Sequence, residues 1–164
     1  MDGLTQEHID QLIACCKVIS DPPRKEMVED RGHKRNDMRL ISEDERYAFS
    51  VFMRVNSKFQ ENFSIGLVYL VPDERNRIDL LRCNGPHGEH ANDFHADSHH
   101  VGCHVHVAKF ETLEQQRFPL LYAETTKGYA TYEEALRYFL KRCNITGWEK
   151  HFPLIEKLPL FDKP

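Results

Sequence analysis

The middle of the chain alternates between apolar and polar residues. Between residues 46 and 56 every second side chain is apolar, and Arg54 lies in the other, more polar set. Residues 63–71 repeat this spacing, and residues 77–83 form a further short run. Since successive side chains of a strand point to opposite faces, the pattern predicts strands with one buried face.

Two further strand regions are predicted on either side of these runs. Residues 25–41 have a weaker pattern, which predicts an exposed hairpin with Gly32 or Asn36-Asp37 near its turn. Residues 101–110 predict the last strand, and they follow a polar segment over residues 85–99 that we interpret as a loop.

Helical spacing is found near the two ends of the chain. Residues 5–19 repeat apolar side chains at helical intervals, and Thr5 is suited to cap this helix. Near the C-terminus, Thr131 and Glu134 form a capping-box pattern ahead of an apolar stripe that ends at Cys143. Residues 148–164 contain three prolines and predict a short helix or an extended arm.

The order of these elements predicts an α+β fold, in which an antiparallel β-sheet has the N-terminal and C-terminal helices packed on one face. A length of 164 residues suits a single domain. Within residues 1–164 we expect an N-terminal helix over 1–20, the sheet over 24–110 with a His-rich loop at 85–100, and a C-terminal helical part over 111–164.

Composition favours a cytoplasmic protein that does not enter a membrane. The N-terminus lacks the basic and apolar regions of a signal peptide, and no apolar run reaches the roughly 18 residues of a spanning helix. The five cysteines show no Cys-x-x-Cys spacing, which predicts reduced thiols.

Charge gives a weak indication of the binding partner. The net charge of −4 provides no bulk attraction to nucleic acid, so such binding requires a local basic patch. Basic residues do gather between Arg24 and Arg39, but acidic residues lie among them. We interpret that stretch as a solvated strand surface.

Histidines are concentrated in one segment of the chain. Seven of the ten histidines lie between His87 and His106. Imidazole is the side chain that most often ligates metals and transfers protons near neutral pH. We therefore expect the functional site in this segment.

Two of these histidines share one predicted strand. On a strand over residues 101–107, His104 and His106 point to the same side, about 7 Å apart at the backbone. That spacing suits shared ligation of one cation, or an acid and a base that flank a phosphate. The preceding loop can bring His87, His90 and Glu89 over the same face.

Two arginines extend this candidate site. Arg54 and Arg82 lie on neighbouring predicted strands, where a guanidinium adds positive charge for binding a phosphate. Alternation assigns Arg54 to the face opposite the core. Both faces of residues 77–83 are partly apolar, which leaves the face of Arg82 open.

The sequence His104-Val105-His106 resembles motifs of three known groups. It is similar to the first half of the cupin metal motif, although the second half of that motif is missing. It matches two positions of the His-x-His-x-His motif of histidine-triad nucleotide hydrolases, with Gly102 in the first position. It also fits the HUH single-strand DNA nucleases, in which Tyr129, Tyr132 or Tyr138 would supply the nucleophile.

Residues 46–143 as a whole resemble bacterial toxins of TumE-type toxin–antitoxin systems. Those toxins have a layout of Arg-x-(Asp/Asn), His and His-x-His, although this chain carries a longer insert over residues 88–100 and an added N-terminal helix. The resemblance implies a toxin-like or phage-defence-like protein that acts on RNA, with Asn84 as a further substrate-binding residue. The matching residues are Leu80, Arg82, Asn84, His87, His104 and His106.

The leading hypothesis is a histidine-dependent phosphodiesterase that cleaves RNA. His104 and His106 would serve as acid and base, with His87 as a third catalytic residue. Arg82 or Arg54 would stabilise the charge of the phosphorane-like state. A divalent transition metal, Zn or Mn, would take its ligands from among His87, His90, His104 and His106, with Glu89 or water completing the set.

Two alternatives stay open at this point. The first is a non-catalytic binding protein, a toxin–antitoxin or phage partner, whose His-rich segment is an interaction surface or a structural metal clamp. Its own partners would be an antitoxin protein or a second copy in a homodimer. The second alternative is a structural domain with a polar histidine face.

Overall fold

The structure of the chain, a computed structural model, is built mainly from β-strands. It describes residues 4–72, 77–86, 91–92, 95–99, 102–114 and 123–158. The elements within these residues are, in chain order, α1 (Gln6–Ala14), β1 (Lys17–Asp21), β2 (Val28–Asp30), β3 (His33–Ser42), β4 (Ala48–Asn56), β5 (Phe63–Leu70), β6 (Arg77–Asn84), β7 (Ala91–Asn92), β8 (His95–His99), β9 (His104–Val107), α2 (Phe110–Glu114), β10 (Ala123–Thr125), α3 (Tyr132–Arg142), β11 (Ile145–Thr146), the 3-10 helix η1 (Trp148–Lys150) and α4 (Pro153–Glu156).

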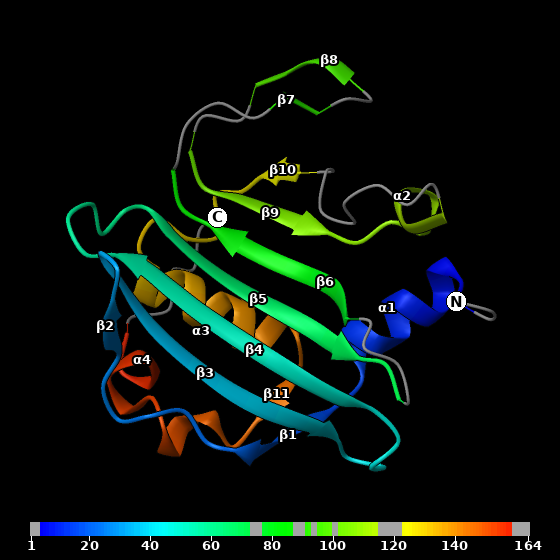
Figure 1. Ribbon diagram of the computed structural model, residues 1–164, viewed down its shortest axis with the longest axis horizontal. Coiled ribbons are helices and arrows are strands. Elements are labelled where there is room, and N and C mark those ends of the chain that lie inside the picture. Colours follow the sequence, from blue (N-terminus) through cyan, green and yellow to red (C-terminus); the bar gives the residue numbers. More distant parts are fainter. Residues whose placement is uncertain are drawn as a thin grey trace.

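Nine of the described strands join in one curled sheet (Figure 1). Its order is β10-β9-β6-β5-β4-β3-β1-β11, and β2 pairs with β3 outside this path. Neighbours along the path are antiparallel except β1 and β11, which run parallel. Strands β7 and β8 pair with each other in a separate two-stranded sheet.

The strands predicted from alternation in the middle of the chain are confirmed. β4, β5 and β6 cover most of the predicted ranges, and β2 and β3 turn at Arg31-Gly32, where both residues have positive φ. The apolar set of β4, from Phe49 to Val55, is buried as expected. It joins buried residues of α1 and α3 in one hydrophobic core.

The predicted α+β arrangement is wrong. The chain is mostly β, its sheet is mixed rather than antiparallel, and the helices are small, with 9 residues in α1 and 11 in α3. The sheet curls, so the helices do not form a layer over one of its faces (Figure 1). Sheet curvature and the pairing of distant strands depend on contacts between residues far apart in the chain, which a local pattern does not contain.

The N-terminal helix is shorter than predicted. Thr5 caps α1 as expected, because its side chain accepts a hydrogen bond from the His8 N–H. The helix stops at Ala14, and the rest of the predicted helical range becomes β1, which lies between β3 and β11.

A buried lysine satisfies the backbone carbonyls at this helix end. Lys17 is fully buried, and its Nζ donates to the carbonyls of Ile13 at 2.8 Å, Cys15 at 2.9 Å and Cys143 at 3.0 Å. Three acceptors use all three N–H donors of an ammonium group. A single side chain therefore satisfies carbonyls at the C-terminal ends of both α1 and α3.

The His-rich segment is not a loop throughout, in contrast to the prediction. Strands β7 and β8 lie within the range 85–100. The strand predicted over 101–110 is limited to β9, and α2 follows it from Phe110. Gly102, with a φ of 123°, lies just before β9 in a backbone conformation that favours glycine and is not compatible with a continuous strand.

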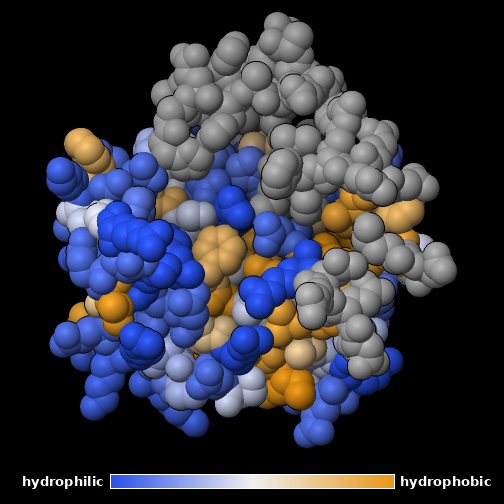
Figure 2. All heavy atoms as spheres, in the orientation of Figure 1, coloured by the Kyte–Doolittle hydropathy of each residue, from blue (hydrophilic) through white to orange (hydrophobic). Residues whose placement is uncertain are grey.

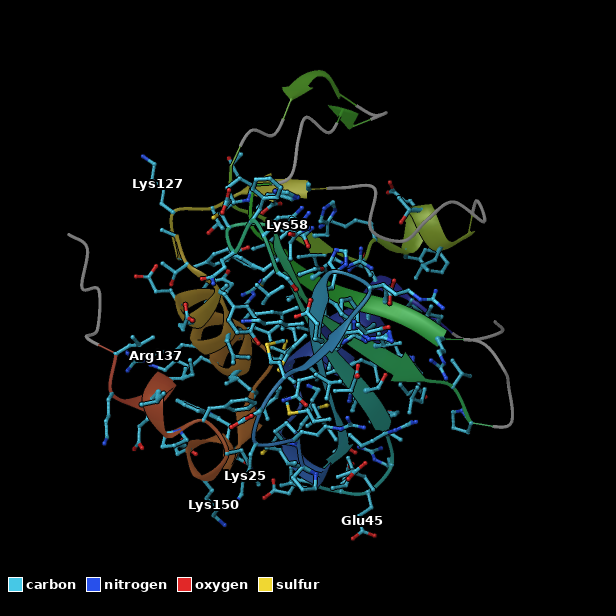
Figure 3. All side chains as sticks on the ribbon, turned by 60° about the vertical axis from the view of Figure 1, so that its left-hand side comes forward. Lys25, Glu45, Lys58, Lys127, Arg137 and Lys150 are labelled. Atoms are coloured by element: carbon cyan, nitrogen blue, oxygen red, sulfur yellow. The ribbon has the colours of Figure 1, made fainter. Side chains whose placement is uncertain are left out.

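The predicted C-terminal helical part is confirmed at α3 and after β11, but the range 111–164 also contains the strands β10 and β11. Thr131 and Glu134 form the expected capping box at the start of α3, and short helices η1 and α4 follow β11. None of the helices in the described ranges is long and apolar enough to cross a membrane. Charged side chains such as Glu45, Lys127 and Lys150 point outward at the margins of the fold (Figure 3).

Candidate functional site

Two adjacent rows of cross-strand partners cross β4, β5, β6 and β9 on the sheet face opposite the core. Paired residues on neighbouring strands project to the same side of a sheet, so the side chains of each row lie next to one another. We call the eight residues of the two rows the arginine–histidine face. The rows are Phe52–Gly66–Arg82–His106 and Arg54–Ser64–Asn84–His104.

The arginine–histidine face contains five of the seven residues predicted from the sequence. They are Arg54, Arg82, Asn84, His104 and His106. The other two, His87 and His90, lie outside the described residues, as does Glu89.

The face of Arg82, which the sequence left open, is the same as that of His106. The register between β5 and β6 shifts between Leu67 and Val68, so that Leu81 pairs with Leu67 but Asp79 pairs with Val68. Leu80 and Leu81 are therefore both buried although they are adjacent. Such a bulge explains why alternation along this strand is ambiguous.

His104 is held by contacts at both ring nitrogens. The residue is fully buried. Its Nδ1 lies 2.9 Å from the carbonyl oxygen of Gly102, and its Nε2 lies 3.3 Å from Nδ2 of Asn84. Nδ1 is therefore the donor to the carbonyl, and Nε2 accepts from the Asn84 amide in the neutral ring. This geometry fixes the orientation of the imidazole.

His106 has a different environment on the same strand. It is half-buried, and its ring lies 5.0 Å from the ring of His104, at an angle of 72° between the planes. The expectation that the two imidazoles lie side by side is confirmed. Its cross-strand partner is Arg82.

Arg82 combines an ion pair, a ring contact and a buried donor. Its guanidinium lies 3.4 Å from the carboxylate of Asp79 and 5.2 Å from the centre of the Phe52 ring. Its Nε is buried and has no hydrogen-bond partner in the part of the chain that the structure describes. A buried donor without a partner usually marks the place of a water, an ion or a ligand group.

Arg54 is more fully occupied by its own neighbours. It donates to the carbonyls of Asn36 and Met53 at 2.9 and 2.8 Å, and to the carboxylate of Asp37 at 2.8 Å. Its side chain is about a third exposed, at 31%. Arg54 is therefore positioned firmly, with fewer donors left for a ligand than Arg82 has.

Phe52 and Gly66 belong to this face but were not among the predicted site residues. A Cβ atom on Gly66 would lie 2.3 Å from the Phe52 ring, so the ring lies directly over the backbone of β5. The guanidinium of Arg54 lies 5.7 Å from the centre of the same ring. A signal for Phe52 was present in the sequence, since alternation places it on the same side as Arg54.

Further polar atoms on this face lack partners. Besides the Nε of Arg82, the buried Oγ of Ser64 and Oδ1 of Asn84 have no hydrogen-bond partner among the described residues. Asn84 is only 3% exposed. Buried polar atoms of this kind commonly take an ordered water or a ligand group as their partner.

The surface around these residues is partly apolar and opens into a groove. Figure 2 shows the sheet side opposite α3, where hydrophobic residues in the middle are bordered by hydrophilic ones. A groove of about 660 Å³ adjoins the face at Arg54. Its lining includes Arg24, Arg35, Asp30 and Asp37.

The metal site predicted from the histidines stays a prediction. Among the described residues, no group of three or more His, Cys, Asp or Glu side chains is arranged to hold a metal ion. Two of its four expected ligands, His87 and His90, lie outside those residues. At His104, a metal on Nε2 would have to displace the amide of Asn84.

The tyrosines considered as nucleophiles are placed unfavourably for that role. Tyr129 is buried, and its hydroxyl donates to the backbone carbonyls of His104 and Asn84 at 2.7 and 3.1 Å. Burial raises the pKa of Tyr129, and it also raises the pKa of Tyr132 and Tyr138. Through these two hydrogen bonds, Tyr129 holds the segment before α3 against the backbone of β6 and β9.

Comparison with known protein families gives one match. A family of unknown function, DUF6978, matches residues 4–145, a range that includes the whole arginine–histidine face. No curated protein and no solved structure matches the chain. Because the match covers most of its length, the chain belongs to the DUF6978 family.

Proposed function

We propose that the arginine–histidine face binds and cleaves a phosphodiester bond in RNA. The observation that carries the proposal is the cross-strand pairing of Arg82 with His106, next to the buried Nε of Arg82 that has no partner among the described residues. A guanidinium donor and an imidazole on adjacent strands supply the two groups that such a reaction needs, one for phosphate charge and one for a proton.

RNA is the substrate class that this pair of residues suits best, because its 2′-hydroxyl is a built-in nucleophile. His106 takes the proton of that hydroxyl, the 2′-oxygen bonds to phosphorus, and the bond from phosphorus to the 5′-oxygen breaks. The leaving 5′-oxygen takes a proton from water, which gives a 2′,3′-cyclic phosphate and a 5′-hydroxyl. The donors of Arg82 stabilise the charge that develops on the phosphate oxygens.

His104 is assigned a positioning role in this scheme. Its Nδ1 contacts the carbonyl of Gly102 and its Nε2 contacts Asn84, so its ring is held beside that of His106. His87 remains the sequence candidate for a second proton-transfer group, and His87 and His90 remain candidates for Zn or Mn ligands. The toxin-like role, the cytoplasmic location and an antitoxin or homodimer partner belong to the same proposal.

A binding protein without catalysis is the second candidate. It is supported by the contacts of His104, because they occupy both of its ring nitrogens and so remove one of the two paired imidazoles from proton transfer. The substrate-binding part of the proposal is common to both candidates, and a cleavage assay separates them.

The test is a cleavage assay on a labelled single-stranded oligoribonucleotide. We expect the wild-type protein to release a product with a 2′,3′-cyclic phosphate, and to leave the 2′-O-methyl version of the same oligonucleotide intact. His106→Ala and Arg82→Ala should each lower kcat/KM by at least about 100-fold, the usual effect of a lost proton-transfer or charge-stabilising group.

Matched control variants lie elsewhere in the chain. His151 is exposed, and Arg46 forms an ion pair with Asp44 much as Arg82 does with Asp79. His151→Ala and Arg46→Ala should cleave as fast as the wild type. Cleavage that persists in both His106→Ala and Arg82→Ala would rule out this chemistry, and binding without any cleavage would favour the second candidate.

A further inference from the structure

We infer that the arginine–histidine face accepts single-stranded RNA, with one base stacked on the ring of Phe52. This inference rests on the proposed function. It adds that the RNA is single-stranded and that Phe52 is the residue that distinguishes a single strand from a duplex. Phe52 lies in the row of Arg82 and His106, two strands away from Arg82 across Gly66.

The position of Phe52 is unusual for an aromatic side chain. It projects away from the core, it is half-buried, and its ring covers Gly66, where a side chain would collide with it. One side of the ring is thus supported by the backbone of β5. Because glycine provides the room for this arrangement, the ring packs against the backbone of β5, and we infer that it serves as a platform.

Positive charge surrounds this platform. The guanidinium groups of Arg82 and Arg54 lie 5.2 and 5.7 Å from the ring centre, and each is held in place by a carboxylate, Asp79 or Asp37. An aromatic ring between positioned arginines is the combination by which proteins bind single-stranded nucleic acid, since the ring stacks on a base and the arginines contact phosphates.

The groove next to Arg54 continues this track. Arg24 and Arg35 line it together with Arg54, and acidic residues lie among them, of which Asp30 pairs with Arg35 and Asp37 with Arg54. Asn36 fixes the Arg24 segment, because its buried side chain accepts from the Arg24 N–H at 3.0 Å and donates to the Arg24 carbonyl at 2.9 Å. From β9 to β3 the track crosses four strand spacings, roughly 19 Å, which suits a short single strand. A base inside a duplex is stacked on both faces by its neighbours, so it has no free face for the platform.

The experiment measures binding of a fluorescent 2′-O-methyl oligouridine, which has no 2′-hydroxyl and so reports binding without cleavage. Phe52→Leu keeps an apolar side chain but removes the stacking surface, and we expect it to weaken binding about tenfold. Phe52→Tyr should bind like the wild type. The duplex form of the oligonucleotide should bind at least tenfold more weakly than the single strand.

Two further measurements identify which base stacks on Phe52 and test whether the groove contacts the phosphates. A single abasic site moved along the oligonucleotide should weaken binding to the wild type at one position and have little effect on Phe52→Leu. Arg24→Gln should lower the salt dependence of binding by about one phosphate contact, and exposed Lys150→Gln should leave it unchanged.

The outcomes separate this inference from the proposed function. Equal affinity of the wild type and Phe52→Leu, or equal affinity for single strand and duplex, would overturn the platform even if His106-dependent cleavage were observed. Binding that depends on Phe52 in a protein that cleaves no RNA would support the platform and reject the catalytic proposal.

Discussion

Two histidines on one strand of this protein have different chemical surroundings. His104 is fully buried and has contacts at both ring nitrogens, whereas His106, two residues further on, is half-buried and faces Arg82. Asn84 on the neighbouring strand makes part of this difference, because its amide occupies Nε2 of His104. The sequence places both imidazoles on one face, but the neighbours that distinguish them come from other parts of the chain.

Lys17 provides a prediction at the same scale. Lys17→Met keeps an unbranched side chain but removes the donor to three carbonyls, at Ile13, Cys15 and Cys143. We expect the free energy of unfolding to fall by about 3 kcal/mol, because buried acceptors lose their partner and hydrogen bonds to a charged group are lost. Chemical denaturation measures this change.

An exposed lysine supplies the control for that experiment. Lys150 points outward from the fold (Figure 3), so Lys150→Met should change stability by less than about 0.5 kcal/mol. Equal stability of Lys17→Met and the wild type would show that other groups satisfy the two helix ends.

At the scale of elements, strand alternation predicts faces only where the register is regular. The faces of β4 and β5 follow directly from the period of two, and so does the position of Arg54. β6 carries a bulge opposite Leu67-Val68, so its residues Leu80 and Leu81 are both buried and the pattern is ambiguous there. The candidate face was therefore predictable on β4 but only partly on β6.

Helix α3 provides a prediction for an element that the sequence did define. The Thr131 side chain accepts from the Glu134 N–H at 3.2 Å, and the Glu134 carboxylate accepts from the Thr131 N–H at 3.3 Å. Thr131→Ala should lower the free energy of unfolding by about 1 kcal/mol, as measured by urea denaturation, whereas Thr131→Ser should retain most of it. Equal losses in the two variants would mean that the hydroxyl is not what stabilises the helix end.

At the scale of the whole molecule, the pairing that local patterns missed joins the two ends of the chain. β1 follows α1 directly, β11 follows α3 directly, and the two strands pair in parallel at Lys17–Ile145 and Val18–Thr146. A strand of two residues carries no detectable period, and its partner lies at the other end of the sequence. This pairing makes the sheet mixed rather than antiparallel, and the curl of the sheet and the small size of the helices account for the rest of the error.

Buried thiol and phenol groups in the core predict how the free energy of unfolding depends on pH. Burial raises the pKa of the Cys143 thiol from 9.0 to about 12, and it also raises the pKa of Cys83 and Tyr129. The unfolded chain releases these protons at lower pH than the folded chain does. Their contribution is therefore complete below about pH 9 and is lost as the pH rises toward the folded values.

Lys17 changes the pH dependence of stability in the opposite direction, but it is a single group. Burial lowers its pKa, so the unfolded chain keeps this proton to higher pH and the contribution of Lys17 to stability rises toward pH 10.5. Two thiols and Tyr129 outnumber this one amine. We expect the free energy of unfolding to fall above pH 9, by up to about 1.4 kcal/mol per pH unit for each group that titrates only in the unfolded chain.

Cys143→Ala isolates one of these groups. The variant loses some packing at every pH, but it no longer has the thiol whose ionisation favours the unfolded chain. Between pH 9 and about pH 11 its unfolding free energy should therefore decline less steeply than that of the wild type, by about 1.4 kcal/mol per pH unit at most. Half-buried Cys16 provides the matched control, and Cys16→Ala should keep the wild-type slope. Parallel curves for Cys143→Ala and the wild type would mean that the alkaline loss arises at other buried groups, because only a thiol that stays protonated in the folded core can produce the difference.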